Sequence, residues 1–135
     1  MLAAAEVPFA CADAELDDGT MLSKPGSRAE AHEQLLALSG RSHWLHSSAV
    51  ITESGERVWG ATESVELIVR PLGEAFVEDY LDREDEAVRW SVGGYRIEGL
   101  GAQLFERIEG SHFAILGLPL LPLLAFLRRR ELIAA

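Results

Sequence analysis

Cysteine is almost absent from this chain, and this scarcity excludes a disulfide within it. Cys11 is the only cysteine among 135 residues. A single thiol forms no disulfide within the chain and fits a reducing compartment. The sequence shows no cationic start followed by an apolar signal core, and the apolar run 113–127 is too short and too interrupted by proline for a membrane span. We therefore expect a cytoplasmic protein without a membrane partner.

Positive charge is also scarce. The chain has 12 Lys and Arg against 22 Asp and Glu, a formal net charge of -10 and a sequence pI of about 4.8. Binding along nucleic-acid backbones needs clustered cations that neutralise phosphates, so no nucleic-acid partner is expected. An anionic substrate would be held locally, and it would arrive most naturally with a divalent cation that acidic side chains coordinate.

Apolar residues, at 48% of 135 positions, are plentiful enough for one core, and we expect a single domain over residues 1–135. The first half alternates strand and helix signals. Residues 7–12 form a short apolar run typical of a buried strand, and Asp17-Asp18-Gly19 predicts a turn after it. Ser27 and Glu30 have the spacing of a capping box, which predicts a helix over 27–39. Two further strands, joined by a hairpin turn, are predicted over 43–52 and 57–69.

The second half is predicted from shorter signals. The pattern of residues 74–81 predicts an amphipathic helix. The acidic stretch 79–86, expected on a loop, indicates a solvated surface rather than a metal cluster. A strand is predicted over 103–108, a buried strand over 113–116, and an apolar helix that opens at Pro119 and ends in arginines 128–130. We expect Trp44 and Trp59 to pack in the core, although a tryptophan beside a cleft can instead stack on a base.

Three polar side chains stand at positions that suit a site. Asp13 follows the first strand, at the sheet edge where ligands bind in open α/β folds, but it could equally be an ordinary turn aspartate. Lys24 could offset phosphate charge, although most lysines are simply solvated. His43 could contact a phosphate or a base, and the alternative is a histidine satisfied by a backbone partner. The glycine-rich stretch 91–101 is typical of backbone that turns tightly beside a cleft.

These blocks together resemble a known family. The run VGGYRIEGLGAQLFERIEG, followed by ILGLPLLPLLAFL, is similar to the C-terminal signature of the Maf nucleoside triphosphate pyrophosphatases. The stretch 12–25, with its aspartate, turn and Lys-Pro pair, resembles a second block of that family, and the Leu-Ser-Gly ending at Gly40 with His43 resembles a third. The resemblance implies an α/β fold with a mixed, curved sheet flanked by helices, similar to the inosine triphosphate pyrophosphatase-like fold and lacking its N-terminal segment.

The resemblance also implies chemistry. Members hydrolyse nucleoside triphosphates to the monophosphate and pyrophosphate with a divalent metal, Mg or Mn. By this resemblance Asp13 is the catalytic residue and a metal ligand, and Glu98 contacts substrate and metal. Lys24, Gly93, Gly94 and His43 are implied to be substrate contacts. A homodimer is a further expectation, because a Maf-like sheet without its first strand would expose an edge.

The sequence departs from the family pattern at several positions. Ser91 stands where many members have lysine, Glu98 where they have glutamine, and Ala14 where they have threonine or glutamine. Nothing in residues 1–7 matches the Ser-x-Ser-Pro-Arg-Arg segment that grips phosphates in the family. Two alternatives therefore stay open. One is a non-catalytic remnant that binds nucleotide or a partner chain, and the other is a structural domain whose 113–127 segment docks on a partner.

Overall fold

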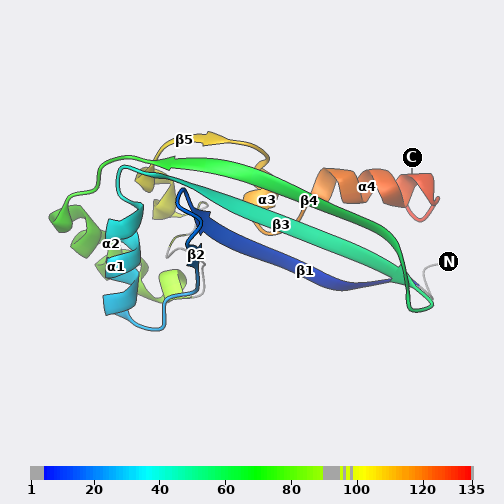
Figure 1. Ribbon diagram of the computed structural model, residues 1–135, viewed down its shortest axis with the longest axis horizontal. Helices are drawn as coiled ribbons and strands as arrows, with labels where there is room; N and C mark the ends of the chain where they lie inside the picture. The colour runs from blue at the N-terminus through cyan, green and yellow to red at the C-terminus, as the bar shows by residue number, and fades with distance from the viewer. Residues whose placement is uncertain (1–4, 90–94, 96, 98, 135) are drawn as a thin grey trace. The chain divides into compact units, whose positions relative to one another are not determined.

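The computed structural model describes residues 5–89, 95, 97 and 99–134 (Figure 1). The elements, in chain order, are β1 (Ala5–Leu16), β2 (Met21–Leu22), α1 (Arg28–Leu38), β3 (Ser42–Glu53), β4 (Glu56–Val69), α2 (Glu74–Arg89), the 3-10 helix η2 (Leu100–Leu104), β5 (Phe105–Glu109), α3 (His112–Ile115) and α4 (Leu120–Arg129). Among the helices of this described part, none is long and apolar enough to cross a membrane.

The strands form one five-stranded sheet in the order β2-β1-β3-β4-β5. β1 pairs antiparallel with β2, and β4 pairs antiparallel with β5, with an irregularity between Ile68 and Val69. The predicted α/β class, with a sheet and packed helices, is confirmed. By its contacts the chain divides into two compact units: unit 1 is Met1–Ala12, His46–Val65 and Gly110–Ala135, and unit 2 is Asp13–Leu45 and Glu66–Glu109. The prediction of a single domain over 1–135 stays a prediction.

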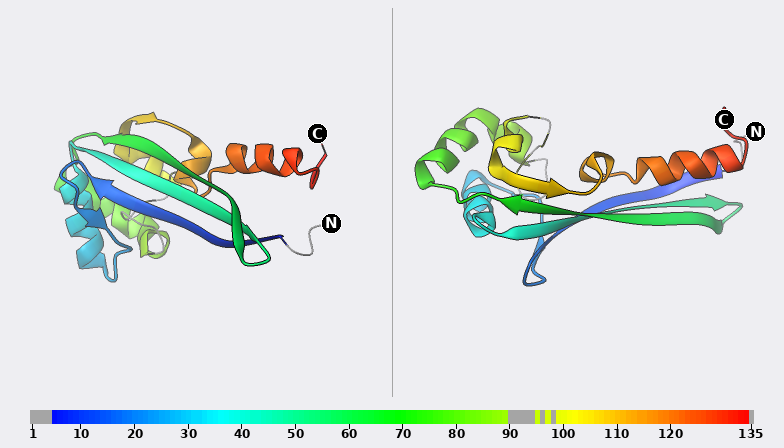
Figure 2. Two further views of the ribbon diagram at one scale, coloured as in Figure 1. Left: turned by 45° about the vertical axis from the view of Figure 1, so that its right-hand side comes forward. Right: turned by 90° about the horizontal axis from the view of Figure 1, so that it is seen from above.

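In unit 2 the helices α1 and α2 pack side by side (Figure 2). The start of α1 is fixed as its sequence predicts: Ser27 Oγ accepts a hydrogen bond from the Glu30 N–H at 3.2 Å, and Glu30 Oε2 accepts one from the Gly26 N–H at 2.7 Å. Gly40, at φ +68°, follows the end of the helix. The apolar faces of both helices are buried, with Leu35, Leu38, Val77 and Leu81 each at most 1% exposed.

In unit 1 the helix α4 packs on the β3–β4 hairpin. Leu123 and Phe126 of α4 form a small core with Ile51 of β3, and Trp59 of β4 stacks on Phe126 with ring centroids 5.5 Å apart. Arg130, at the end of the helix, forms an ion pair with Glu53. The predicted apolar helix ending in arginines is thus confirmed. Trp59, which was predicted to pack in the core, is partly buried against this small core.

Three local predictions are wrong. Residues 113–116 lie in and beside the short helix α3, between Gly110 and Gly117, rather than in a strand; an apolar run this short does not distinguish helix from strand. The acidic stretch 79–86 continues α2 instead of forming a loop, because Val77, Leu81 and Val88 keep a buried face at helical spacing. Trp44 is 37% exposed, since the strand β3 turns its even-numbered positions away from the core.

Candidate functional site

Two of the predicted site residues, Asp13 and Lys24, lie in or just beyond the strands of the β1–β2 hairpin. In the antiparallel register of this hairpin, Ala14 pairs with Leu22 and Glu15 pairs with Met21. The prediction that Asp13 follows the first strand is wrong, because β1 continues to Leu16 and the backbone of Asp13 lies inside it. Lys24 is exposed just beyond β2.

The turn of this hairpin is held by its own residues. The Thr20 N–H donates to Asp18 Oδ1 at 2.9 Å, and Gly19 has a φ of +88° that glycine adopts without strain. The Thr20 hydroxyl and N–H lower the pKa of Asp18, and Arg41 lowers it further. Arg41 also forms an ion pair with Asp17. Asp17 and Asp18 thus stabilise the turn of the hairpin.

Two described residues of the glycine-rich stretch, Tyr95 and Leu100, form hydrogen bonds with other elements of the fold. Tyr95 Oη lies 2.8 Å from His43 Nε2, and the Leu100 N–H donates to Glu84 Oε1 at 3.2 Å. Gly93, Gly94 and Glu98, which the family resemblance implies as contacts, lie outside the described residues, as does Ser91. The sequence analysis did not single out Tyr95 or Glu84 as residues that make these contacts, although Tyr95 belongs to the Gly-Gly-Tyr motif.

His43 is buried rather than open to a ligand. The side chain, in β3, has 0% exposure, and its ring lies 5.6 Å from the Tyr95 ring and 6.1 Å from the Phe105 ring, measured between centroids. Burial lowers the pKa of His43 from 6.5 to about 4 and raises the pKa of the Tyr95 hydroxyl. Both side chains are therefore neutral near pH 7, and the contact is a neutral hydrogen bond.

This burial predicts a pH dependence of stability. Between pH 6.5 and about 4 the unfolded chain binds a proton at His43 that the folded chain does not. Stability from this residue is therefore present above pH 6.5 and lost as the pH falls toward 4, by up to about 3 kcal/mol. Urea unfolding at pH 7 and 4.5 should show this loss in the wild type and a smaller one in His43→Gln. An equal loss in both proteins would contradict it.

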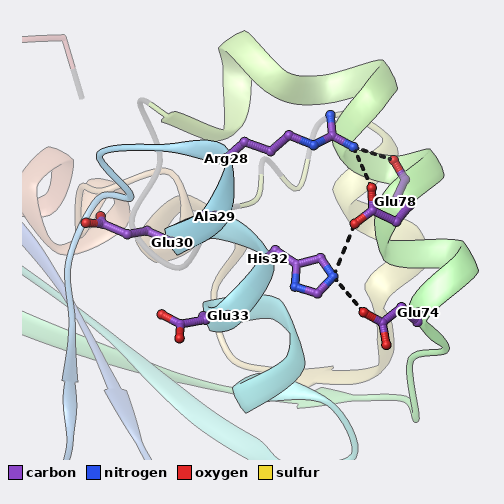
Figure 3. A pocket seen from close by; sticks show the side chains of 7 residues that line it. All are labelled: Arg28, Ala29, Glu30, His32, Glu33, Glu74 and Glu78. Carbon is purple, nitrogen blue, oxygen red and sulfur yellow. Dashed lines mark hydrogen bonds and ion pairs between the residues drawn. The ribbon is translucent and has the colours of Figure 1, made fainter.

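A shallow groove between α1 and α2 is lined by Arg28, Ala29, Glu30, His32, Glu33, Glu74 and Glu78 (Figure 3). His32 Nε2 lies 3.2 Å from Glu74 Oε1 and 3.3 Å from Glu78 Oε1, while an Arg28 nitrogen lies 2.9 Å from Glu78 Oε2. In the described part of the chain, no group of three or more His, Cys, Asp or Glu side chains is placed to hold a metal ion. The groove joins two helices through half-exposed charges, each of small energetic effect.

Comparison with known proteins decides the family. A model of the family described as Maf-like protein matches residues 4–130. The chain belongs to the Maf-like protein family. Curated relatives include a protein named nucleoside triphosphate pyrophosphatase from Sphingopyxis alaskensis, which is 47% identical over 113 residues, 84% of this chain and 57% of that protein.

Other Maf-like relatives carry the same name. One from Caulobacter vibrioides is 48% identical over 118 residues, covering 87% of this chain and 59% of its own length. One from Paramagnetospirillum magneticum is 50% identical over 118 residues, covering 87% of this chain and 61% of its own length. The family predicted from the sequence is confirmed. The Maf-like chain spans less than two thirds of the length of these relatives.

Proposed function

We propose that this Maf-like chain is a nucleoside triphosphate pyrophosphatase that hydrolyses canonical or modified nucleotides to the monophosphate and pyrophosphate. The observation that supports the proposal is the match of the Maf-like family model to residues 4–130, together with relatives named for this activity. A carboxylate and a cation, which we propose to be Asp13 and Lys24, suit the hydrolysis of a phosphoanhydride, a reaction that enzymes promote mainly by positioning and charge stabilisation.

In this proposal Asp13 orients the attacking water and accepts its proton as the water oxygen bonds to the α-phosphorus. The bond from the α-phosphorus to the bridging oxygen breaks, and pyrophosphate leaves with that oxygen. Lys24 faces charge that builds on the phosphate oxygens, so its ammonium lowers the energy of the transition state. The exposure of Lys24 fits this role, because a bound phosphate must reach it from solvent.

The donor set proposed for a metal consists of the carboxylates of Asp13 and Glu98. Oxygen donors of this kind suit Mg and Mn, and Mg is commonly held by one or two carboxylates together with water and substrate phosphates. When bound, such a cation would neutralise phosphate charge and polarise the attacked phosphoryl group.

The remaining predicted substrate contacts are made by backbone at two glycines and by the side chain of Glu98. Gly93 and Gly94 would let backbone approach the nucleotide closely, and Glu98 would accept a hydrogen bond where the family glutamine can also donate one. His43 has no exposed surface, so we assign it an indirect role. We place the activity in the cytoplasm, since the lone Cys11 fits a reducing compartment. A homodimer stays a prediction.

The test is release of pyrophosphate, measured against orthophosphate, from a panel of canonical and modified nucleoside triphosphates with Mg or Mn. We expect pyrophosphate and monophosphate in equal amounts and no orthophosphate. Circular dichroism on the same sample must show that the chain is folded. A folded chain that binds nucleotide but releases no pyrophosphate would contradict the proposal and support a non-catalytic remnant.

A further inference from the structure

The hairpin of β3 and β4 contains two buried polar atoms that the proposed mechanism does not use. Among the described residues, Ser47 Oγ of β3 and Glu63 Oε2 of β4 have no hydrogen-bond partner. Ser47 is 0% exposed, whereas Glu63 is partly exposed and keeps this one oxygen buried. A buried polar atom without a partner destabilises a fold, so folded proteins keep few of them. Both atoms are therefore candidates for binding a ligand.

Ser47 and Glu63 lie opposite each other on one face of the hairpin. The residues on both sides of Ser47 lie within hydrogen-bond distance of those on both sides of Glu63, at 2.7 Å in each case: His46 with Ser64, and Ser48 with Thr62. Because successive side chains of a strand point to opposite faces, Ser47 and Glu63 share the other face. At such positions the Cβ atoms are about 5 Å apart, so one small group can contact both side chains.

The segment 110–119 crosses this face of the hairpin. At its start, a Cβ on Gly110 would lie 2.8 Å from Val65, and after its end α4 packs on Ile51. Val65 and Ile51 lie on the same face as Ser47 and Glu63, one on either side of them along the hairpin. The connection between these two contacts therefore covers the two unpartnered atoms.

This cover is thin where it forms α3. The helix has four residues, and Ala114 is the only one of them that is buried. Phe113 is 38% exposed, and Leu116, directly after the helix, is 54% exposed. An element with so few buried contacts opens locally at a small cost in free energy, without unfolding of the rest of the chain. A ligand can thus reach Glu63 from its exposed side and Ser47 beneath it.

The chemistry of the two side chains restricts what they bind. A carboxylate oxygen only accepts hydrogen bonds, whereas a serine hydroxyl both donates and accepts them. Together they match a ligand edge that carries an N–H donor beside an acceptor. Nucleobases present such an edge when they are unpaired, and proteins recognise bases through it.

We propose that Ser47 and Glu63 bind the base of the nucleotide. Glu63 Oε2 accepts an N–H of the base, and the Ser47 hydroxyl donates to the acceptor beside that N–H. The inference rests on the proposed function for the identity of the ligand, while the lack of partners among the described residues is an observation on this chain. The base supplies the hydrogen bonds that the two side chains need.

Four variants of the full chain test the two side chains. Ser47→Ala removes the buried hydroxyl, and Ser48→Ala is its control, because the Ser48 hydroxyl is bonded to Thr62. Glu63→Met keeps the length of the side chain and removes both oxygens. Glu56→Met makes the same exchange at an exposed position of the same strand.

The first measurement is the melting temperature of each protein without nucleotide. We expect Ser47→Ala and Glu63→Met to raise it by about 3–6 °C, because each removes a buried polar atom that has no partner. Ser48→Ala should lower it slightly, since a bonded hydroxyl is lost, and Glu56→Met should leave it unchanged. Melting temperatures of Ser47→Ala and Glu63→Met below that of the wild type would overturn the inference that these atoms lack partners.

The second measurement is the dissociation constant, by titration calorimetry, for nucleotides that differ in one edge of the base. Uridine triphosphate is compared with its N3-methyl analogue, and adenosine triphosphate with its N6,N6-dimethyl analogue, so that the N–H donors of this edge are lost and the phosphates stay the same. We expect the wild type to prefer the unmethylated member by about a hundredfold for the base that it binds more tightly. Glu63→Met should reduce this preference to about threefold and Ser47→Ala to about tenfold, while both controls keep it.

The outcomes separate the base contact from the reaction. Equal affinity of the wild type for both members of each pair, or no binding of either nucleotide, would overturn the base contact. A full preference in Glu63→Met and Ser47→Ala would assign the contact to other residues. If the wild type shows the preference and the variants lose it, but no pyrophosphate is released, the proposed function fails and the base site stands.

Discussion

Replacing Asp13 with asparagine is expected to lower the rate of pyrophosphate release by about a thousandfold. Asparagine has nearly the same shape but neither accepts a proton nor carries the charge that orients water and metal, and positioned acid–base groups of this kind contribute about 10²–10⁴ in rate. The change is measured as kcat/KM on the nucleotide that the wild type hydrolyses fastest.

Asp79→Asn is the matched control, since Asp79 is exposed on α2 and forms an ion pair only with Arg83 among the described residues. It should leave the rate within about twofold of the wild type, because exposed ion pairs have small energetic effects. If Asp13→Asn kept a rate close to that of Asp79→Asn, the assignment of Asp13 as the catalytic residue would be wrong.

Gly110→Ala is expected to destabilise the fold by about 2–4 kcal/mol, the largest effect on stability that we predict for a single methyl group. Gly110 has a φ of +140°, a region that side chains rarely occupy. A Cβ there would lie 2.8 Å from Val65 Cγ2 and 3.1 Å from Val65 Cα. Val65 is fully buried, so neither residue can move away cheaply. Urea unfolding followed by tryptophan fluorescence measures the loss.

Alanine substitutions at two other glycines distinguish the two causes of this destabilisation, which are backbone strain at a positive φ and steric contact with Val65. Gly55 has a φ of +79° and no atom within 4 Å of the place that a methyl group would occupy, so Gly55→Ala should cost only the backbone strain, about 1 kcal/mol. Gly73 has open space and no positive φ, and Gly73→Ala should be close to neutral. Equal losses in all three variants would mean that contact with Val65 contributes nothing.

Local signals in the sequence were sufficient where short-range chemistry decides the structure. The Ser27 cap, the turn at Gly19 and the arginine-ended helix α4 follow from hydrogen-bonding groups and conformations a few residues apart. The register of β1 with β2 was foreseeable in the same way, since the turn fixes which residues face each other. The hairpin that contains Asp13 is therefore the part of the candidate site that sequence reasoning could supply.

Long-range contacts were not foreseeable. His43 and Tyr95 are 52 residues apart, and nothing in either local sequence says that one ring nitrogen meets the other hydroxyl. The region of α3 was predicted as a strand because four residues are too few to show a helical or strand periodicity. The end of α2 was predicted too early because the acidic residues indicated a loop, although Val77, Leu81 and Val88 have helical spacing. Tertiary packing decided each of these cases.

The measurement that tests the central claim most directly is hydrolysis of a nucleoside triphosphate by this chain in water enriched in oxygen-18, with mass analysis of both products. Attack at the α-phosphorus, as proposed for water oriented by Asp13, predicts one heavy oxygen in the monophosphate and none in the released pyrophosphate. Heavy oxygen in the pyrophosphate, or release of orthophosphate with a nucleoside diphosphate, would contradict the account.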